Sequence, residues 1–367
     1  MPPILTRAID NVRSLFGGAL EWDGGDALDP AAMAVTALGM GVPILIGVLI
    51  GHPRIGLAAS LGAMWVGNAP RGASLAEHMR MVRDIVLAAV GAAIVAAAIA
   101  QHGPLSDAGL VLTAGIAALI GGFSRPAAIA SQRFIVFVTI GLGVAAHARD
   151  RVALAILIAG GAFWAATCAL VIGVAARRLG IGQAAPVEPP AKATFAQLYR
   201  RWQRTLATTA AWTYPLRLVA CLACALAIRE ALPEHHYSWI AVAVALLTQR
   251  QGDGLVVKVM QRALGVAAGV IATEAIAARP LPGWALVVII AGLAATSPSL
   301  RKRSYVAYTA ATTPLIMLLT SGGETIGQEL LLDRLVATLI AATLVIAAFL
   351  TARRLMPPPS PDSPRPG

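Results

Sequence analysis

Twelve apolar runs of helical length follow one another along the chain. The first half holds six of them, at Ala31–Gly51, Ile55–Val66, Ile85–Ala100, Leu110–Phe123, Phe134–Ala146 and Val152–Ala176. The second half holds six more, at Tyr214–Ile228, Trp239–Thr248, Val259–Ala278, Trp284–Ala295, Tyr305–Thr320 and Leu330–Ala352. A bilayer crossing needs about 20 apolar residues, so several runs are short and re-entrant segments stay open. The pattern predicts an all-α polytopic membrane protein with about twelve transmembrane helices.

These runs divide the chain into five parts. A cytoplasmic segment (1–30) leads into a first six-helix membrane repeat (31–176), and a basic cytoplasmic linker (177–212) precedes a second six-helix repeat (213–355). A Pro-rich tail (356–367) is expected to be disordered. Near the start, Leu5, Ile9, Val12 and Phe16 recur at helical spacing. That spacing fits a short interfacial helix, and a solvated tail is the alternative.

The composition and the distribution of charge also indicate a membrane protein. Hydrophobic residues make up 57% of the chain and charged residues 13%, against about 25% charged in soluble domains. The net charge of +11 lies between the apolar runs, so we expect it to set orientation and expect no nucleic-acid partner. With both termini and the linker in the cytoplasm, the cations left outside are Arg54, Arg149, Arg151, Arg229, Arg279 and Arg334. Removing these six from 29 leaves 23 inside, as the positive-inside rule predicts.

The two halves resemble each other in their local signals. A histidine precedes the short second run in each half, at His52 and at His235 and His236. Both halves end on the sequence Ala-Arg-Arg-Leu. An even number of helices per half makes the predicted repeat parallel, and transporters place their site where such repeats meet. The alternative is that any two six-helix halves look alike.

The segment Arg301–Thr320 organises the predicted bundle. Three consecutive cations open it and read as a cytoplasmic anchor. Hydroxyl side chains then recur on one helical face, and Pro314 frees a backbone carbonyl one turn earlier. Exposed backbone of this kind is tolerated in a membrane only against protein or a wet cavity. We therefore expect this helix to carry a water-facing polar stripe.

The candidate substrate site combines this stripe with the ends of the short runs. Paired short or interrupted helices are the best sequence pointer to a transport site. Guanidinium groups at their cytoplasmic ends suit carboxylates, because two parallel donors meet two oxygens. For each arginine, topology or lipid headgroup contact is the alternative, as interfacial anchoring is for Trp65 and Trp239. The expected substrate-binding residues are Arg303, Arg262, Arg133, Arg250, Tyr305, Tyr308, Thr312, Thr313 and Trp239.

Other chemistry is sparse in this sequence. Glu274 lies within an apolar run and is a candidate proton-coupling group, with an interfacial ion pair to Arg279 as the alternative. The three cysteines lie in apolar runs without metal-ligand spacing, so no cofactor, metal or disulfide is expected. No phosphate-binding loop or nucleophile elbow occurs. We therefore expect no enzymatic activity.

Three stretches of the second half together resemble a known family. They are the Trp-led stretch from His235 to Gly269, the basic-Tyr-Thr-Pro helix from Arg301 to Leu319, and the acidic-Arg run from Leu330 to Ile346. In this order they resemble the fusaric acid resistance protein-like (FUSC) family, which is grouped with bacterial aromatic acid exporters and related to plant malate channels. Trp239, Arg262, Arg303, Tyr305, Thr313 and Arg334 match its motif positions. Two features depart from the family pattern. The Thr that usually lies shortly after the Trp is missing after Trp239, and the linker (177–212) is too short to hold the large cytosolic domain that some members carry.

The resemblance implies an inner-membrane protein that exports small aromatic or other organic acids, driven by an ion gradient or by the anion's own gradient. Its implied partners are the organic anion and the lipid bilayer, with a homo-oligomer or a periplasmic adaptor open. One alternative is a passive organic-anion channel with the same residues. The other is a non-transporting membrane scaffold, in which the linker would be the docking element.

Overall fold

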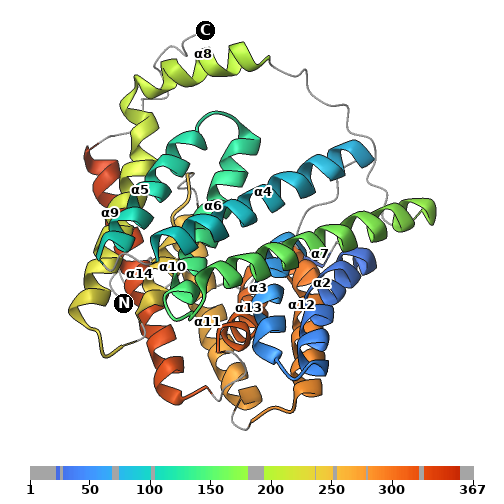
Figure 1. Cartoon of the computed structure of the whole chain (residues 1–367). Coiled ribbons are helices and arrows are strands. Elements are labelled where there is room, and N and C mark those ends of the chain that lie inside the picture. Colours follow the sequence, from blue (N-terminus) through green and yellow to red (C-terminus); the bar gives the residue numbers. More distant parts are fainter. Residues whose placement is uncertain are drawn as a thin grey trace, which may run out of the picture.

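The structure is a computed structural model that describes residues 22–24, 28–67, 74–100, 104–180, 194–235, 237–250, 254–277, 280–321 and 326–355. Within these ranges it contains thirteen helices and no strand (Figure 1). The first half comprises α2 (Pro30–Leu49), α3 (Pro53–Gly67), α4 (Leu75–Ile99), α5 (Pro104–Ile120), α6 (Arg125–Ala145) and α7 (Arg151–Arg178). After α8 (Phe195–Leu206), the second half comprises α9 (Thr209–Ala231), α10 (Ser238–Leu247), α11 (Leu255–Ala277), α12 (Gly283–Arg303), α13 (Tyr305–Thr320) and α14 (Gln328–Leu355).

Eight of the described helices are long and apolar enough to cross a membrane. The others among the twelve apolar runs form shorter helices: α3 has 15 residues, α5 has 17, α10 has 10 and α13 has 16. The structure therefore confirms an all-helical multi-pass membrane protein. The predicted shortness of the second run holds in both halves, whereas only one of the two fifth runs is short, because α6 has 21 residues.

The same pairs of helices pack together in each half. In the first half α3 packs on α2 and α7, and α4 packs on α6 and α7. In the second half α10 packs on α9 and α14, and α11 packs on α13 and α14. Four pairs join the halves: α2 with α12, α9 with α5, α3 with α13, and α10 with α6. Each of these pairs has its counterpart when the order of the halves is exchanged.

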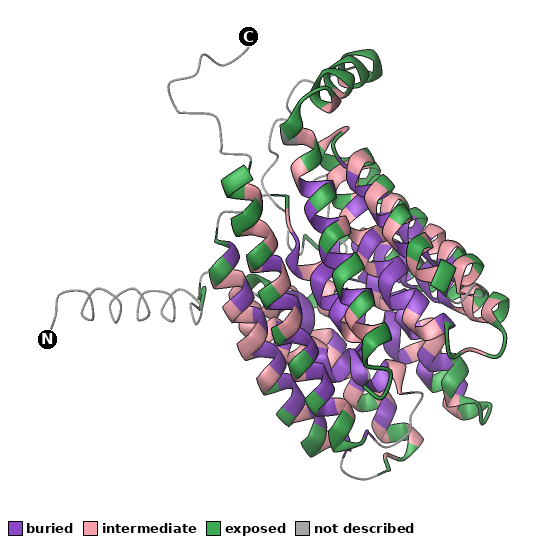
Figure 2. Cartoon of the chain, turned by 90° about the vertical axis from the view of Figure 1, so that its left-hand side faces the viewer, coloured by how far each residue is buried: buried purple, intermediate pink, exposed green. Residues whose placement is uncertain are grey.

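Buried residues lie along the helix faces that meet inside the bundle, and the outward faces and α8 are exposed (Figure 2). Small residues allow helices to pack closely. A Cβ atom at Gly265 would lie 2.6 Å from Cβ of Thr309, and one at Gly269 would lie 2.6 Å from Cβ of Thr313. The glycines thus let α11 approach α13 at a distance that larger residues would prevent. This contact fixes the position of the helix that carries the predicted polar stripe.

Two expected connections are helical in the structure. The sequence predicts a basic link before Tyr305, but α12 continues through Pro298 and the three cations to Arg303. Only Ser304 separates α12 from α13, and its hydroxyl accepts a hydrogen bond from the backbone N–H of Ala307 at 3.4 Å. The corresponding stretch of the first half forms the start of α6. There Ser124 accepts from the N–H of Ala127 at 3.2 Å, with proline in the first turn, where its missing N–H costs nothing.

Several predicted features lie outside the described residues. These are the N-terminal segment up to residue 21, most of the linker (181–193) and the Pro-rich tail (356–367). Arg279, the partner expected for Glu274, is also among them.

Candidate functional site: an arginine-lined cavity

A cavity of about 650 Å³ lies where the two halves meet. Its walls come from α3 and α6 of the first half and from α10 to α14 of the second half. Two of the contacts that join the halves, α3 with α13 and α10 with α6, contribute to it. The volume is within the range of about 300–1,000 Å³ that is usual for small-molecule sites.

Arginines dominate the polar lining of this cavity. The lining contains Arg125, Arg133, Arg250, Arg262, Arg301 and Arg334, and no aspartate or glutamate among the described residues. Arg125, Arg250 and Arg301 are exposed and lie at the ends of their helices or just beyond them, whereas Arg262 and Arg334 are buried. The cavity therefore carries positive charge from its exposed rim to its floor.

Arg262 and Arg334 form the floor, from α11 and α14. They are 6% and 2% exposed, and their guanidinium groups repel each other. The Nε atom of each finds no hydrogen-bond partner among the described residues. The guanidinium carbon of Arg334 lies 3.8 Å from the centroid of the Trp239 ring, a cation–π contact. The described part of the protein thus offers Arg334 an aromatic face and offers neither charge a carboxylate.

The polar stripe of α13 forms one wall. Tyr305, Tyr308, Thr309, Thr312 and Thr313 all line the cavity. Thr312 and Thr313 donate to the backbone carbonyls of Tyr308 and Thr309, both at 2.9 Å. The hydroxyl of Thr309 is buried and has no partner among the described residues. One helical face thus presents two phenols and three hydroxyls to the arginines.

An aromatic pair from the first half also lines the cavity. The rings of Trp65 on α3 and Phe137 on α6 stack with centroids 4.2 Å apart and an interplanar angle of 7°. Both residues line the cavity, and the indole Nε1 of Trp65 has no hydrogen-bond partner in the described structure. An unused donor beside a flat ring surface suits a ligand that combines an aromatic ring with a polar group.

Two arginines bind backbone carbonyls near the ends of α5 and α10. Arg217 donates to the carbonyl of Gln249 just beyond α10, and Arg250 donates to the carbonyl of Ala118 at the end of α5. The guanidinium carbon of Arg250 also lies 4.6 Å from the centroid of the Tyr214 ring. Burial lowers the pKa of Arg250, and the nearby phenol of Tyr214 acts in the opposite direction. These two arginines therefore stabilise the backbone around the cavity.

Most of the predicted substrate-binding residues line this cavity. Seven of them do: Arg262, Arg133, Arg250, Tyr305, Tyr308, Thr312 and Thr313. Arg303 does not, and Arg301 takes its place, because α12 remains helical through both residues and turns them in different directions. Trp239 stands behind the lining and supports Arg334. Glu274 is exposed outside the cavity and accepts a hydrogen bond from Nε2 of Gln328 at 2.9 Å.

One residue of the cavity floor was not among the predicted substrate-binding residues. The predicted topology counts Arg334 among the cations on the outer side, and the structure buries its side chain within α14. The sequence does contain an indication that Arg334 is functional, because it is a charged residue within an apolar helical run. The same indication makes Glu274 a candidate. Arg125 and Arg301 were counted only as cytoplasmic charges, because nothing in the local sequence says which arginine of a cluster faces inward.

Comparison with known proteins supports the sequence resemblance for the second half. No curated protein and no solved structure matches the chain. Residues 222–348, from within α9 to within α14, match the family model described as fusaric acid resistance protein-like, so the second half of this membrane protein carries a domain of that family.

Proposed function

We propose that the protein transports small organic anions across the membrane through the arginine-lined cavity, with aromatic carboxylates as the preferred class. The family match supports a membrane transport or efflux role. The cavity supports the anionic substrate, because six arginines and no carboxylate line it among the described residues.

One observation carries most of this proposal: the two buried arginines of the cavity floor have no acidic partner among the described residues. Burying an unpaired charge is costly, and proteins normally pair or neutralise it. A bound carboxylate would supply the missing charge and could accept hydrogen bonds from the free Nε groups of Arg262 and Arg334. The site is therefore most stable when it holds an anion.

The aromatic preference rests on the walls of the cavity. Trp65 and Phe137 present a stacked aromatic surface, and Tyr305 and Tyr308 lie with ring centroids 6.2 Å apart. Aromatic rings attract other rings through offset or edge-to-face contacts of about 0.5–1.5 kcal/mol beyond simple burial. An anion with a ring would gain these contacts, and an aliphatic anion would not.

The topology follows from the same arguments. We propose twelve membrane segments arranged as two parallel six-helix repeats, which the equivalent helix packing in the halves supports. We also propose the bacterial inner membrane as the location, with both termini in the cytoplasm. The exposed arginines of the cavity rim would then face the cytoplasm and export would start there.

Efflux from proteoliposomes tests the proposal. Vesicles are loaded with labelled benzoate, or with succinate as an aliphatic comparison, and release is measured with and without an imposed proton gradient. We expect faster release of benzoate than from protein-free vesicles, and stimulation by the gradient. If neither acid is released faster than from protein-free vesicles, the proposed function is wrong.

A passive organic-anion channel is the second candidate, and one observation favours it. No carboxylate among the described residues lines the cavity, and Glu274, the expected proton-coupling residue, lies outside it. Without a nearby protonatable acid, the anion would move down its own gradient. Release of benzoate that the proton gradient leaves unchanged would favour this channel over the exporter.

A further inference from the structure

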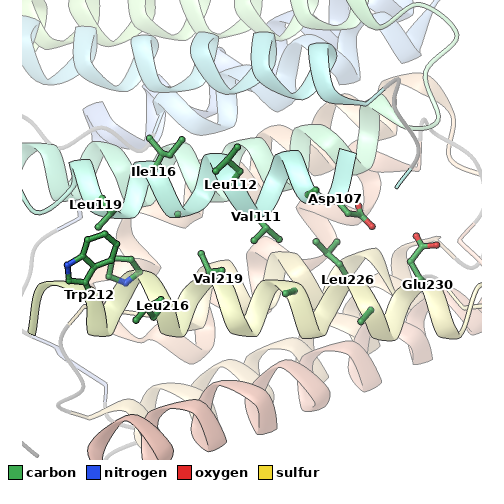
Figure 3. A pocket seen from close by; sticks show the side chains of 15 residues that line it. Asp107, Val111, Leu112, Ile116, Leu119, Trp212, Leu216, Val219, Leu226 and Glu230 are labelled. Atoms are coloured by element: carbon green, nitrogen blue, oxygen red, sulfur yellow. The ribbon is translucent and has the colours of Figure 1, made fainter. Parts of the chain in front are cut away.

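A second, apolar groove of about 660 Å³ lies between α5 and α9, one of the contacts that join the halves (Figure 3). Aliphatic side chains such as Val111, Leu112 and Val219 line its length. The two ends differ: Asp107 and Glu230 lie at one, and Leu119 and Trp212 at the other (Figure 3). The groove has no part in the arginine-lined cavity, with which it shares no lining residue.

The amphipathic helix α8 is attached to both walls at the second end. The indole Nε1 of Trp202 on α8 donates to the carbonyl of Leu119 at 3.2 Å, which ties α8 to α5. The indole Nε1 of Trp212 on α9 donates to the carbonyl of Leu206, the last residue of α8, at 2.9 Å. Because Leu119 and Trp212 both line the groove, α8 lies across its end (Figure 1).

The side chains of α8 combine aromatic rings with positive charge. Phe195, Tyr199 and Trp202 form a cluster with Phe123, with ring centroids 5.4–6.3 Å apart. The helix FAQLYRRWQRTL also carries three exposed arginines and no acid: Arg200, Arg201 and Arg204. An amphipathic helix with aromatic and basic faces is typical of a segment that lies in the membrane interface and attracts anionic lipid.

The equivalent contact between the halves is closely packed. A Cβ atom at Gly41 of α2 would lie 3.0 Å from Cβ of Ala291 on α12, and one at Gly283 would lie 2.7 Å from a methyl of Val48. The α5–α9 contact, by contrast, leaves the groove between its two helices.

We propose that this groove binds an anionic phospholipid, with an acyl chain between α5 and α9 and the phosphate at the arginines of α8. From Asp107 to Leu119 the groove follows α5 for about 18 Å, at about 1.5 Å per residue. One leaflet of a hydrocarbon core of about 30 Å is about 15 Å deep, so the groove matches one acyl chain. Charge favours this orientation. At one end Asp107 and Glu230 carry one more negative charge than Arg229, which pairs with them at 2.6 and 2.7 Å, whereas the arginines of α8 at the other end attract a phosphate.

Native mass spectrometry of the delipidated protein in detergent tests this site. The protein is titrated with phosphatidylglycerol or with phosphatidylcholine of the same acyl chains. We expect tighter binding of phosphatidylglycerol, and the variant R200Q/R201Q/R204Q should weaken that binding roughly ten- to a hundredfold, because each basic residue contributes to headgroup attraction. Binding of phosphatidylcholine should change little in this variant. Equal binding of the two lipids to the wild type would overturn the proposal.

Two controls separate this site from general charge and surface effects. The variant R178Q/R353Q/R354Q removes three arginines at the ends of α7 and α14, and should leave lipid binding unchanged. Ala223→Phe fills the groove from α9 and should lower binding of both lipids, whereas Ala220→Phe on an exposed position of α9 outside the lining should not. Equal effects of the paired variants would overturn the site. A dimer that Ala223→Phe dissociates, with no bound lipid, would assign the groove to a second copy of the chain instead.

Discussion

Removing the charge of Arg334 separates a binding role from a structural one. This guanidinium is 2% exposed, lies on the indole of Trp239 and has an Nε atom without a partner among the described residues. Arg334→Gln keeps hydrogen-bonding capacity and removes only the positive charge. If Arg334 is there for a ligand, the substitution should harm transport and leave the fold intact.

The expected change in stability follows from two opposing contributions. Losing the desolvated cation–π contact with Trp239 costs about 2 kcal/mol. Removing a buried charge that has no acidic partner in the described part of the chain saves an effective desolvation penalty of several kcal/mol. The second contribution is at least as large as the first. The free energy of unfolding of Arg334→Gln should therefore equal or exceed that of the wild type.

The expected change in binding has the opposite sign. A hydrogen bond to a charged group contributes about 1.5–3 kcal/mol. Since each 1.4 kcal/mol is a factor of ten in affinity, the half-saturating anion concentration should rise about ten- to a hundredfold. Anion binding should also raise the thermal unfolding temperature of the wild type, and this increase should be much smaller in the variant.

Efflux of labelled benzoate and thermal unfolding in detergent, with and without benzoate, measure both effects. Arg229→Gln is the matched control, because Arg229 pairs with Asp107 at 2.6 Å outside the cavity. Its loss leaves a carboxylate unpaired, so unfolding temperature should fall and efflux should stay near the wild-type value. Wild-type efflux in Arg334→Gln would refute the role of Arg334. A fall in its unfolding temperature as large as that of Arg229→Gln would show that the residue is structural.

Three further substitutions test other parts of the structure. Gly269→Val inserts methyl groups where α11 meets α13 and should destabilise the protein by about 1–3 kcal/mol in thermal unfolding, whereas Gly292→Val, which faces open space, should not. Trp65→Leu removes the ring stack in the cavity wall and should reduce the efflux of benzoate relative to succinate by up to about tenfold; equal loss for both acids would contradict the aromatic preference. Arg301→Gln should slow efflux more than Arg303→Gln, because only Arg301 lines the cavity, and the reverse order would restore the sequence-based assignment.

The sequence predicted the elements of this fold well because membrane helices have a strong local signal. Each apolar run is a described helix, and the hydroxyl spacing of Tyr305, Tyr308 and Thr312 placed them on one face before any contact was known. Helical periodicity is enough for such predictions, since it depends only on the position of a residue along its own helix.

The arrangement of the cavity could not be predicted in the same way, because it depends on contacts between residues that are far apart in the sequence. Whether Arg301 or Arg303 faces inward depends on whether α12 continues through the basic cluster, and the apolar run that predicts this helix ends at Ala295, before the cluster begins. Arg334 appeared as an outer charge, because its contact with Trp239 joins residues 95 positions apart. The sequence also contains no direct sign of the groove, which exists because α5 and α9 pack less closely than α2 and α12.

The unequal contacts between the halves have a mechanical consequence. Interdigitated packing, as between Gly41 and Ala291, resists sliding and separation, while a groove filled by a mobile chain yields to both. If one half rotates relative to the other, the tightly packed α2–α12 contact would serve as the rotation axis. The α5–α9 contact would then open and close. The stiffness of the α5–α9 contact would then depend on the lipid bound in the groove. The lipid composition of the membrane would therefore influence the rate of transport.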